Sequence, residues 1–331
     1  MFNVGKPAEA RILVVRLGAL GDIIHALPAV ASLKHSFAEA HLTWAVEWKW
    51  APLLEQNPFV DTVLPIDRGS LAGLHESWRR LRSARYDFAI DFQGLLKSAL
   101  VASCARPNRI FGFHHTQVRE RAAALFYSNK TLSSAVHVVD KNLDLSAAAG
   151  AAGVLRKFPL PPGCAEGQLP GDFVLASPLA GWRAKQWPLE YYGVLASWLR
   201  RDLRLSLVLD GPPAAAPLLS GVPDVIARSS TISGLIYATR RAAAVIGVDS
   251  GPLHIAAALG KPGVAMFGPT DPARNGPYGD SLRVLRDPAA MTTYKRNASI
   301  DDSMRRISPE QVFEALRSVL GERRQPVACV T

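Results

Sequence analysis

Short apolar runs alternate along the chain with segments of helical periodicity, as in sheets of parallel strands joined by helices. Runs without polar alternation predict buried parallel strands at residues 12–15, 173–177, 242–248 and 263–267. Further strand-like runs lie at 41–46, 60–66, 86–91 and 205–209. Helices are predicted at 23–34, 71–83, 253–259 and 308–320. The alternation predicts an α/β fold with parallel sheets.

One segment is rich in residues that end regular structure. Residues 157–171 contain four prolines and three glycines. We therefore predict a linker at 161–171, between an N-terminal domain (1–160) and a C-terminal domain (172–331). Residues 272–306 are polar and predicted to be rich in loops.

The composition is that of a globular protein. The chain has 331 residues, of which 48% are hydrophobic and 20% charged, enough for two domains with separate cores. The sequence has no run of 18 or more apolar residues, so we expect no transmembrane helix. Residues 11–16 predict a first strand rather than a signal peptide. Three cysteines without metal-ligand spacing favour a reducing cytoplasm and no disulfide framework.

The net charge of +10 is unevenly distributed. The stretch from Arg79 to Lys130 contains ten basic and only three acidic residues, which gives it a net charge of +7. Nucleic acid, an anionic membrane surface or an acidic substrate would each fit such a stretch, and so would a solvated basic face. No aromatic-interleaved RNA motif or zinc-finger spacing favours nucleic acid.

The segment after the predicted strand 242–248 could bind phosphate. Asp249, Ser250 and Gly251 form a small loop, and Pro252 suits the first turn of the following helix. Free N–H groups and the positive end of the helix dipole favour an anion at such a helix N-terminus. An ordinary βαβ crossover that binds nothing is an equal alternative.

A second loop follows the first strand. Gly18-Ala-Leu-Gly-Asp22 lies where open α/β sheets place their ligands, but it lacks the Gly-x-Gly-x-x-Gly spacing of a dinucleotide site. Asp22 could be the N-cap of the next helix or a general base.

Four segments together carry a resemblance to bacterial heptosyltransferases, glycosyltransferase family 9. They are Arg-Leu-Gly-Ala-Leu-Gly-Asp-Ile-Ile-His (16–25), Asp-Phe-Gln-Gly-Leu-Leu-Lys-Ser (91–98), Lys-Gln-Trp-Pro (185–188), and Gly-Val-Asp-Ser-Gly-Pro-Leu-His (247–254) with Phe-Gly-Pro-Thr-Asp (267–271). The second segment is more similar to heptosyltransferase I than to heptosyltransferase II. The resemblance implies a GT-B fold, with two Rossmann-like domains facing across a cleft and a last helix, about 308–322, packing back on the N-terminal domain.

The resemblance also assigns residues to roles. It implies Asp22 as the catalytic base and Lys185 as the cation that neutralises the leaving diphosphate. The donor-binding residues it implies are Gly21, Lys185, Asp249, Ser250, Gly251, Pro252, Leu253, His254, Gly268, Pro269 and Thr270. The acceptor-binding residues it implies are Gln93, Lys97, Arg119 and Arg121. Lys97 could equally be solvated, and His254 could equally be structural.

The activity implied is inverting transfer of heptose from ADP-heptose to the Kdo region of a lipid A precursor, in synthesis of the lipopolysaccharide inner core. No acidic pair has metal spacing, so we expect no metal dependence, and no cofactor is implied. The expected partners are the nucleotide sugar and an anionic glycolipid, with no nucleic acid. We expect a monomer in the cytoplasm, in peripheral contact with the inner membrane.

The chain departs from the family pattern in two places. Ala180 and Gly181 replace hydroxyl residues upstream of Lys185, and no Glu lies at 211–217 to contact the ribose. A family member with another donor or acceptor is therefore one alternative. Two others are an NAD-type oxidoreductase and a non-enzymatic protein that binds lipopolysaccharide or nucleic acid.

Overall fold

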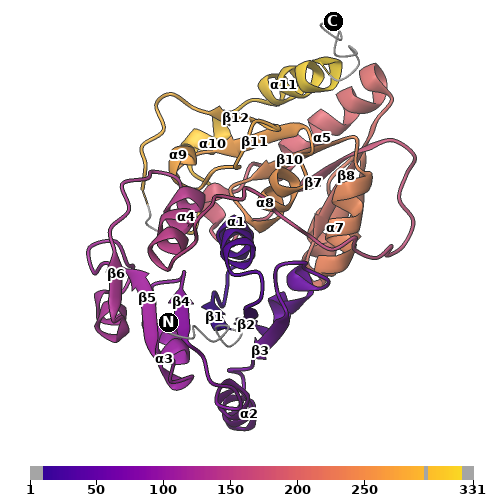
Figure 1. The fold of residues 1–331 in the computed structure, drawn as a ribbon. Coiled ribbons are helices and arrows are strands. Elements are labelled where there is room, and N and C mark those ends of the chain that lie inside the picture. The colour runs from indigo at the N-terminus through magenta and orange to yellow at the C-terminus, as the bar shows by residue number, and fades with distance from the viewer. Residues whose placement is uncertain (1–9, 294–296, 323–331) are drawn as a thin grey trace, which may run out of the picture. The chain divides into compact units, whose positions relative to one another are not determined.

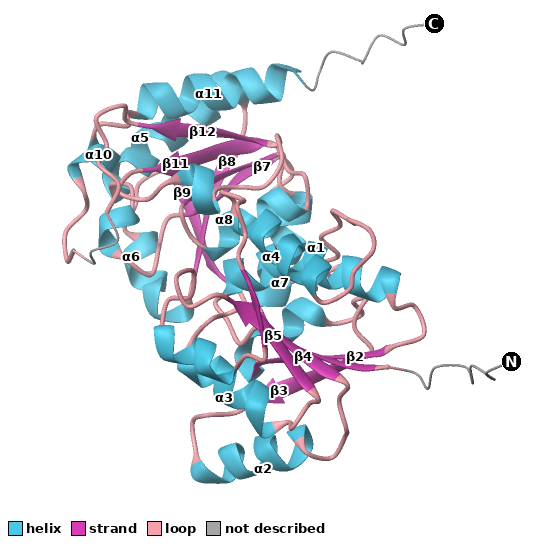
Figure 2. Ribbon diagram, turned by 60° about the vertical axis from the view of Figure 1, so that its left-hand side comes forward, coloured by secondary structure: helices cyan, strands magenta, loops and turns pink. Residues whose placement is uncertain are grey.

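The computed structural model describes residues 10–293 and 297–322. The chain divides into two compact units, residues 1–161 and 162–331 (Figure 1). Each unit has a single six-stranded parallel sheet with helices on both faces (Figure 2). This confirms the predicted α/β class.

The first unit has the strand order β3-β2-β1-β4-β5-β6. Its strands are β1 (Arg11–Val15), β2 (His41–Glu47), β3 (Thr62–Ile66), β4 (Phe88–Asp91), β5 (Arg109–Phe113) and β6 (Asn129–Thr131). Its helices are α1 (Leu20–Ser36), α2 (Leu71–Leu81), α3 (Leu96–Cys104) and α4 (Val138–Ala148), with short 3₁₀ turns η1 (Trp48–Leu54) and η2 (Arg121–Phe126). Helices α1 and α4 pack together, and Asn142 and Ser146 of α4 donate to backbone carbonyls of α1.

The second unit has the order β12-β11-β10-β7-β8-β9. Its strands are β7 (Phe173–Ser177), β8 (Ser206–Gly211), β9 (Val225–Ser229), β10 (Ala244–Val248), β11 (Gly263–Phe267) and β12 (Leu282–Arg286). Its helices are α5 (Leu189–Trp198), α6 (Ala216–Ser220), α7 (Ile232–Arg241), α8 (Gly251–Ala258), α9 (Pro272–Asn275), α10 (Asp302–Arg305) and α11 (Pro309–Glu322), with short turns η3 (Arg183–Lys185), η4 (Leu199–Leu203) and η5 (Pro213–Ala215). Every residue of β7, β10 and β11 is buried, which explains their unbroken apolar sequences.

The strand orders define where each unit can hold a ligand. In the first unit the order reverses between β1 and β4, and in the second between β7 and β10. Loops leaving two such strands diverge to opposite faces of the sheet and open a crevice at the carboxyl ends. The loops after β1, β4, β7 and β10, together with the first turns of the helices that follow them, contain most of the site residues predicted from the sequence.

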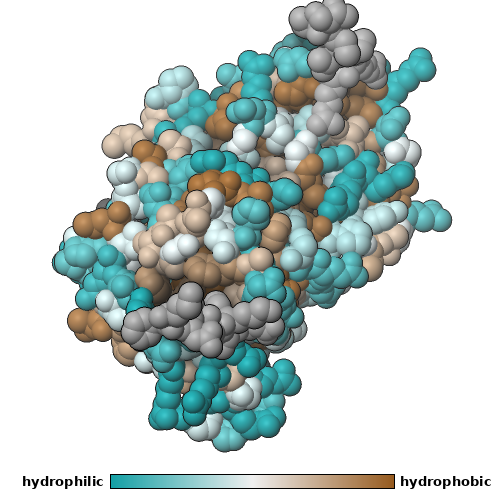
Figure 3. Space-filling view, in the orientation of Figure 1, coloured by the Kyte–Doolittle hydropathy of each residue, from teal (hydrophilic) through white to brown (hydrophobic). Residues whose placement is uncertain are grey.

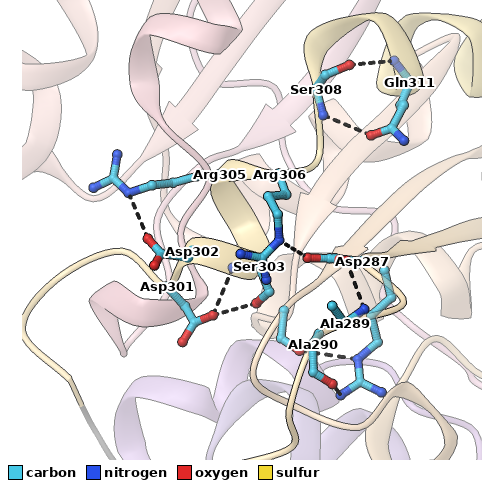
Figure 4. A network of polar contacts seen from close by, with 12 residues as sticks. Asp287, Ala289, Ala290, Asp301, Asp302, Ser303, Arg305, Arg306, Ser308 and Gln311 are labelled. Atoms are coloured by element: carbon cyan, nitrogen blue, oxygen red, sulfur yellow. Dashed lines mark hydrogen bonds and ion pairs between the residues drawn. The ribbon is translucent and has the colours of Figure 1, made fainter.

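Residues 272–306, predicted to be rich in loops, also contain three short regular elements. The segment contains α9, the edge strand β12 and α10. Polar contacts organise its end: Asp287 accepts hydrogen bonds from the Ala289 N–H and from Arg306, while Asp301 accepts from the N–H and hydroxyl of Ser303 (Figure 4). The strand escaped prediction because β12 exposes part of its apolar surface, as an edge strand can.

Helix α11 belongs to the core of the second unit. Val312, Phe313 and Leu316 are buried in that core, and the Phe313 ring meets Trp198 of α5 edge to face. The predicted packing of this helix on the N-terminal domain stays a prediction.

Two expectations from the sequence concern transmembrane helices and the cysteines. Within residues 10–293 and 297–322, no helix is long and apolar enough to cross a membrane. Cys104 and Cys164 are free thiols, and Cys329 lies outside the described residues.

A buried carboxylate in the second unit makes the stability of that unit dependent on pH. Asp210 of β8 is 4% exposed and accepts from Arg228 Nε at 2.9 Å and from the Ser230 hydroxyl at 2.8 Å. Burial raises the pKa of Asp210 from 3.8 to about 6, although Ser230 and Arg228 act to lower it. The folded chain therefore keeps this proton up to a higher pH than the unfolded chain does.

We predict that the titration of Asp210 lowers the free energy of unfolding as the pH rises from about 4 to about 6. Between these values the folded state binds more protons, so the free energy of unfolding falls by roughly 1–3 kcal/mol and then stays level. The stability of wild type relative to Asp210→Asn, measured by urea unfolding across this pH range, should fall by that amount. Asp202→Asn, an exposed control, should show no such fall. A constant difference between wild type and Asp210→Asn would contradict the assignment.

Candidate functional site

The crevice of the second unit is bridged by an ion pair. Lys185, at the end of η3 after β7, lies with its Nζ 2.5 Å from Oδ2 of Asp249, the residue that follows β10. The Thr270 hydroxyl, in the loop after β11, donates to the same oxygen at 2.7 Å. Loops after three parallel strands therefore meet at one carboxylate at the carboxyl edge of the sheet.

Lys185 is held in place from two sides. Its side chain is 15% exposed, and its ammonium lies 4.5 Å from the centroid of the Trp182 ring. Among the described residues the ammonium donates to Asp249 alone. An ammonium group has three N–H donors, so Lys185 can also donate to an anion in the crevice.

Helix α8 begins at this ion pair. Ser250 is its N-cap residue in extended conformation, yet the side chain makes no capping hydrogen bond. The Ser250 Oγ is buried and has no hydrogen-bond partner among the described residues. Gly251 and Pro252 form the first turn and are partly exposed. An unused hydroxyl at an open helix N-terminus is suited to a phosphate group.

The other predicted donor-binding residues of this unit are mostly inside it. The Leu253 side chain is fully buried and packs on Gly247, so any contact of Leu253 with a ligand would be through its backbone. His254 is 5% exposed. Gly268 and Pro269 are buried as well: the Gly268 carbonyl accepts from Arg286 and the Pro269 carbonyl from the Thr293 N–H. These residues shape the loop that carries Thr270.

In the first unit, Asp22 has a defined position at the crevice. It is the third residue of α1, and its Oδ2 accepts from the Ala19 N–H at 3.1 Å. Its Oδ1 lies 2.7 Å from Arg16 Nη2. The N-cap alternative was therefore wrong in position, since Ala19 is the N-cap and Asp22 closes the turn from inside the helix. The Asp22 side chain is 44% exposed and open to a substrate.

The loop after β4 braces the loop that carries Asp22. Gln93 Oε1 accepts from the Leu17 N–H at 2.8 Å, and Arg16 Nη1 donates to the Phe92 carbonyl. The fully buried Asp91 accepts in turn from the Gln93 N–H at 2.8 Å and from the Tyr127 hydroxyl at 2.7 Å. Burial raises the pKa of Asp91, and these hydrogen bonds offset that only in part. Gln93, predicted to bind the acceptor, is engaged in this brace.

The remaining predicted residues of the first unit border the same loops. Gly21 is buried in the first turn of α1. Lys97, in the first turn of α3, forms an ion pair with Glu47 at 3.6 Å and is 39% exposed. Arg119 and Arg121 are exposed and flank Glu120, whose carboxylate accepts from the Leu96 N–H at 2.7 Å. The structure thus brings these two arginines beside the N-terminus of α3.

Sequence reasoning missed two groups at these edges. One is the Asp210–Arg228–Ser230 cluster, in which the buried Arg228 Nη1 has no partner among the described residues. The other is the Glu47 cluster at the end of β2, in which Glu47 forms ion pairs with Lys49, Arg68 and Lys97. Neither group forms a recognisable sequence motif, because its residues lie far apart in the chain and are brought together by the pairing of neighbouring strands. No group of three or more potential metal ligands occurs within the described part of the chain.

Comparisons with known proteins agree with the geometry. The family Glycosyltransferase family 9 (heptosyltransferase) matches residues 74–302. Lipopolysaccharide heptosyltransferase 1 of Pseudomonas aeruginosa is 30% identical over 298 residues, covering 82% of this chain and 82% of that protein. Lipopolysaccharide heptosyltransferase 2 of Salmonella typhimurium is 26% identical over 352 aligned residues, covering 94% and 99%.

A solved structure has the same fold. The E. coli heptosyltransferase WaaC with ADP matches with a TM-score of 0.76 at 24% identity, covering 93% of this chain and 99% of that one. The family resemblance and the GT-B fold expected from the sequence are thereby confirmed. The chain belongs to glycosyltransferase family 9 and is a glycosyltransferase with two Rossmann-like domains.

Proposed function

We propose that this enzyme transfers heptose from ADP-heptose to the Kdo region of a lipid A precursor, with inversion at the anomeric carbon. The observation that carries the proposal is the group at the N-terminus of α8: Lys185 paired with Asp249, beside the unpartnered Ser250 hydroxyl. A cation, a free hydroxyl and helix N–H groups at one sheet edge suit a diphosphate.

The identity of the donor is supported by the relatives. The Pseudomonas and Salmonella proteins are named heptosyltransferases, and the E. coli structure was solved with ADP. The motif at residues 91–98, which is more similar to that of heptosyltransferase I, supports the type 1 reaction, in which Kdo accepts the heptose.

The donor site would stabilise the leaving group. As the bond between the anomeric carbon and the diphosphate oxygen breaks, negative charge grows on the departing ADP. Lys185 is already oriented by Asp249 and Trp182, so it can meet that charge without rearranging. Asp249, whose Oδ2 accepts from Lys185 and Thr270, would orient these donors and bond the sugar rather than the diphosphate. We propose that no metal or cofactor takes part.

Asp22 would be the base for the acceptor. Its carboxylate would take the proton of the acceptor hydroxyl as that oxygen attacks the anomeric carbon from the face opposite the diphosphate, and ADP would leave. Arg16 and the Ala19 N–H each occupy one lone pair, and a carboxylate has about four lone-pair sites. The exposed side of Asp22 therefore keeps acceptor capacity for the proton.

The acceptor would be an anionic glycolipid, reached at the cytoplasmic face of the inner membrane by a monomeric enzyme. The basic stretch from Arg79 to Lys130 supports this, because cations favour an anionic surface. Helix α2, at the foot of the view in Figure 3, has a largely hydrophilic surface that includes exposed Arg79 and Arg80.

A transfer assay tests the function and the base together. We predict that the wild type adds one heptose to Kdo-lipid A in the presence of ADP-heptose, as measured by mass spectrometry. Asp22→Asn should lower kcat by about 10²–10⁴-fold, because the amide keeps the Ala19 hydrogen bond but cannot take a proton. ADP affinity should be unchanged, and the exposed control Asp202→Asn should behave as wild type. Full activity of Asp22→Asn would rule out this base.

A second prediction separates a bracing role of Gln93 from acceptor binding. Because Gln93 Oε1 fixes the Leu17 N–H, Gln93→Ala should lower kcat by about tenfold, while the acceptor KM changes less than twofold. Gln93→Glu retains an oxygen acceptor and should recover most of kcat. Steady-state kinetics with varied acceptor measure both parameters. A raised KM with unchanged kcat would instead make Gln93 an acceptor contact.

A further inference from the structure

Helix α2 packs on the first unit through a narrow row of mostly small residues. Leu81 is 3% exposed and lies in the core of that unit, and the Ser77 hydroxyl, on a residue 5% exposed, accepts from the Asp67 N–H at 3.0 Å. A methyl group placed on Gly73 would meet the Asp67 carboxylate. Because Gly73, Ser77 and Leu81 are spaced four apart, they lie along one side of the helix.

A second row, made of large apolar residues, lies beside the first and is not covered. Leu71, Leu74 and Trp78 follow the spacing i, i+3, i+7, so they too share one side of the helix. Their exposed fractions are 86%, 44% and 44%. Single exposed apolar residues are common on protein surfaces, but a contiguous row of three on one helix marks a surface that binds something.

Arginines surround this apolar row. Arg82 continues the row one turn after Trp78, and its guanidinium lies 4.8 Å from the centroid of the Trp78 ring. Arg79 and Arg80 share a single carboxylate, that of Glu76, at 2.8 Å and 2.7 Å. Residues 71–82 thus contain three arginines and one acidic residue, a net charge of +2. Apolar residues with a tryptophan and flanking arginines suit the headgroup boundary of an anionic bilayer.

The position of α2 in the first unit suits a docking helix. The helix follows β3, so Leu71, its first residue, lies toward the carboxyl edge of the sheet, the edge from which the loop of Asp22 also leaves. Both ribbon views show α2 at an outer end of the first unit, next to α3 (Figures 1 and 2). The apolar row therefore begins on the side of the unit where the acceptor would be bound.

We propose that the row Leu71, Leu74 and Trp78 inserts into the headgroup boundary of an anionic lipid bilayer. The arginines beside the row bind lipid phosphates. A second copy of the chain fits less well, because a two-fold contact would set the same arginines of both copies against each other. The inference rests on the proposed function for its purpose, which is to bring Asp22 to a lipid-linked acceptor, but docking itself can be measured without turnover.

Sedimentation of full-length protein with lipid vesicles tests the docking surface. We predict that the wild type binds vesicles of phosphatidylglycerol and phosphatidylcholine in equal parts, and does not bind phosphatidylcholine alone. The double variant Leu71→Gln/Leu74→Gln should bind about tenfold or more weakly, because two side chains no longer bury apolar surface. Arg82→Gln should bind about fivefold more weakly. The matched control Leu218→Gln, which changes an exposed leucine of α6 in the second unit, should bind as wild type.

A second measurement reports insertion rather than binding. Brominated phosphatidylcholine in the anionic vesicles should quench part of the tryptophan fluorescence of the wild type. Trp78→Phe keeps an apolar ring and should still sediment with the vesicles, but the quenched part of the fluorescence should fall. Equal quenching in the two proteins would contradict insertion of this row.

Four results of the sedimentation experiments would overturn the proposal. They are no binding of the wild type to the anionic vesicles, wild-type binding by Leu71→Gln/Leu74→Gln, an equal loss in Leu218→Gln, and a wild-type dimer that the double variant converts to a monomer. Circular dichroism checks that each variant is folded. If docking is observed but heptose is not transferred to an acceptor in detergent, the proposed function fails and the docking surface stands. The reverse result leaves the function and removes the surface.

Discussion

The contact on which the second unit depends is the ion pair between Lys185 and Asp249. It joins the loops after β7 and β10, the two strands between which the order of the sheet reverses. Two partly desolvated charges at 2.5 Å are costly to separate, so the pair fixes both loops and the start of α8. Thr270 adds the loop after β11 to the same carboxylate. The result is a crevice at which an oriented lysine, a hydroxyl without a protein partner and the N-terminus of α8 lie together.

In the first unit, the two loops at the crevice are joined by hydrogen bonds rather than by an ion pair between them. Its crevice lies between β1 and β4, and the loops after these strands are joined by Gln93 to the Leu17 N–H and by Arg16 to the Phe92 carbonyl. Asp91, fully buried beneath them, anchors the second loop. This bracing supports the loop before Asp22 and leaves the Asp22 carboxylate exposed, as its proposed role of general base requires.

Much of this could be read from the sequence, but not all of it. Strands such as 263–267 were predictable because burial on both faces leaves an unbroken apolar run. The residues 249–251 at the start of α8 were predictable because Gly and Pro mark the turn. The brace of Gln93, the position of Asp22 inside α1 and the Glu47 cluster were not. The brace and the Glu47 cluster depend on strand register, which brings together residues far apart in the chain, and a sequence pattern carries no register. The start of α1 at Leu20 was missed because its N-cap residue, Ala19, has no capping side chain to mark it.

The central claim is that the crevice beside Lys185 binds the diphosphate of an adenine nucleotide sugar without a metal. Calorimetry of ADP, UDP and GDP with purified protein in EDTA tests it most directly. We predict that ADP binds best and that Lys185→Ala weakens ADP binding by about tenfold or more, because the charge that meets the diphosphate is lost. Preference for UDP or GDP would contradict the ADP-heptose assignment, and unchanged ADP affinity in Lys185→Ala would contradict the site itself.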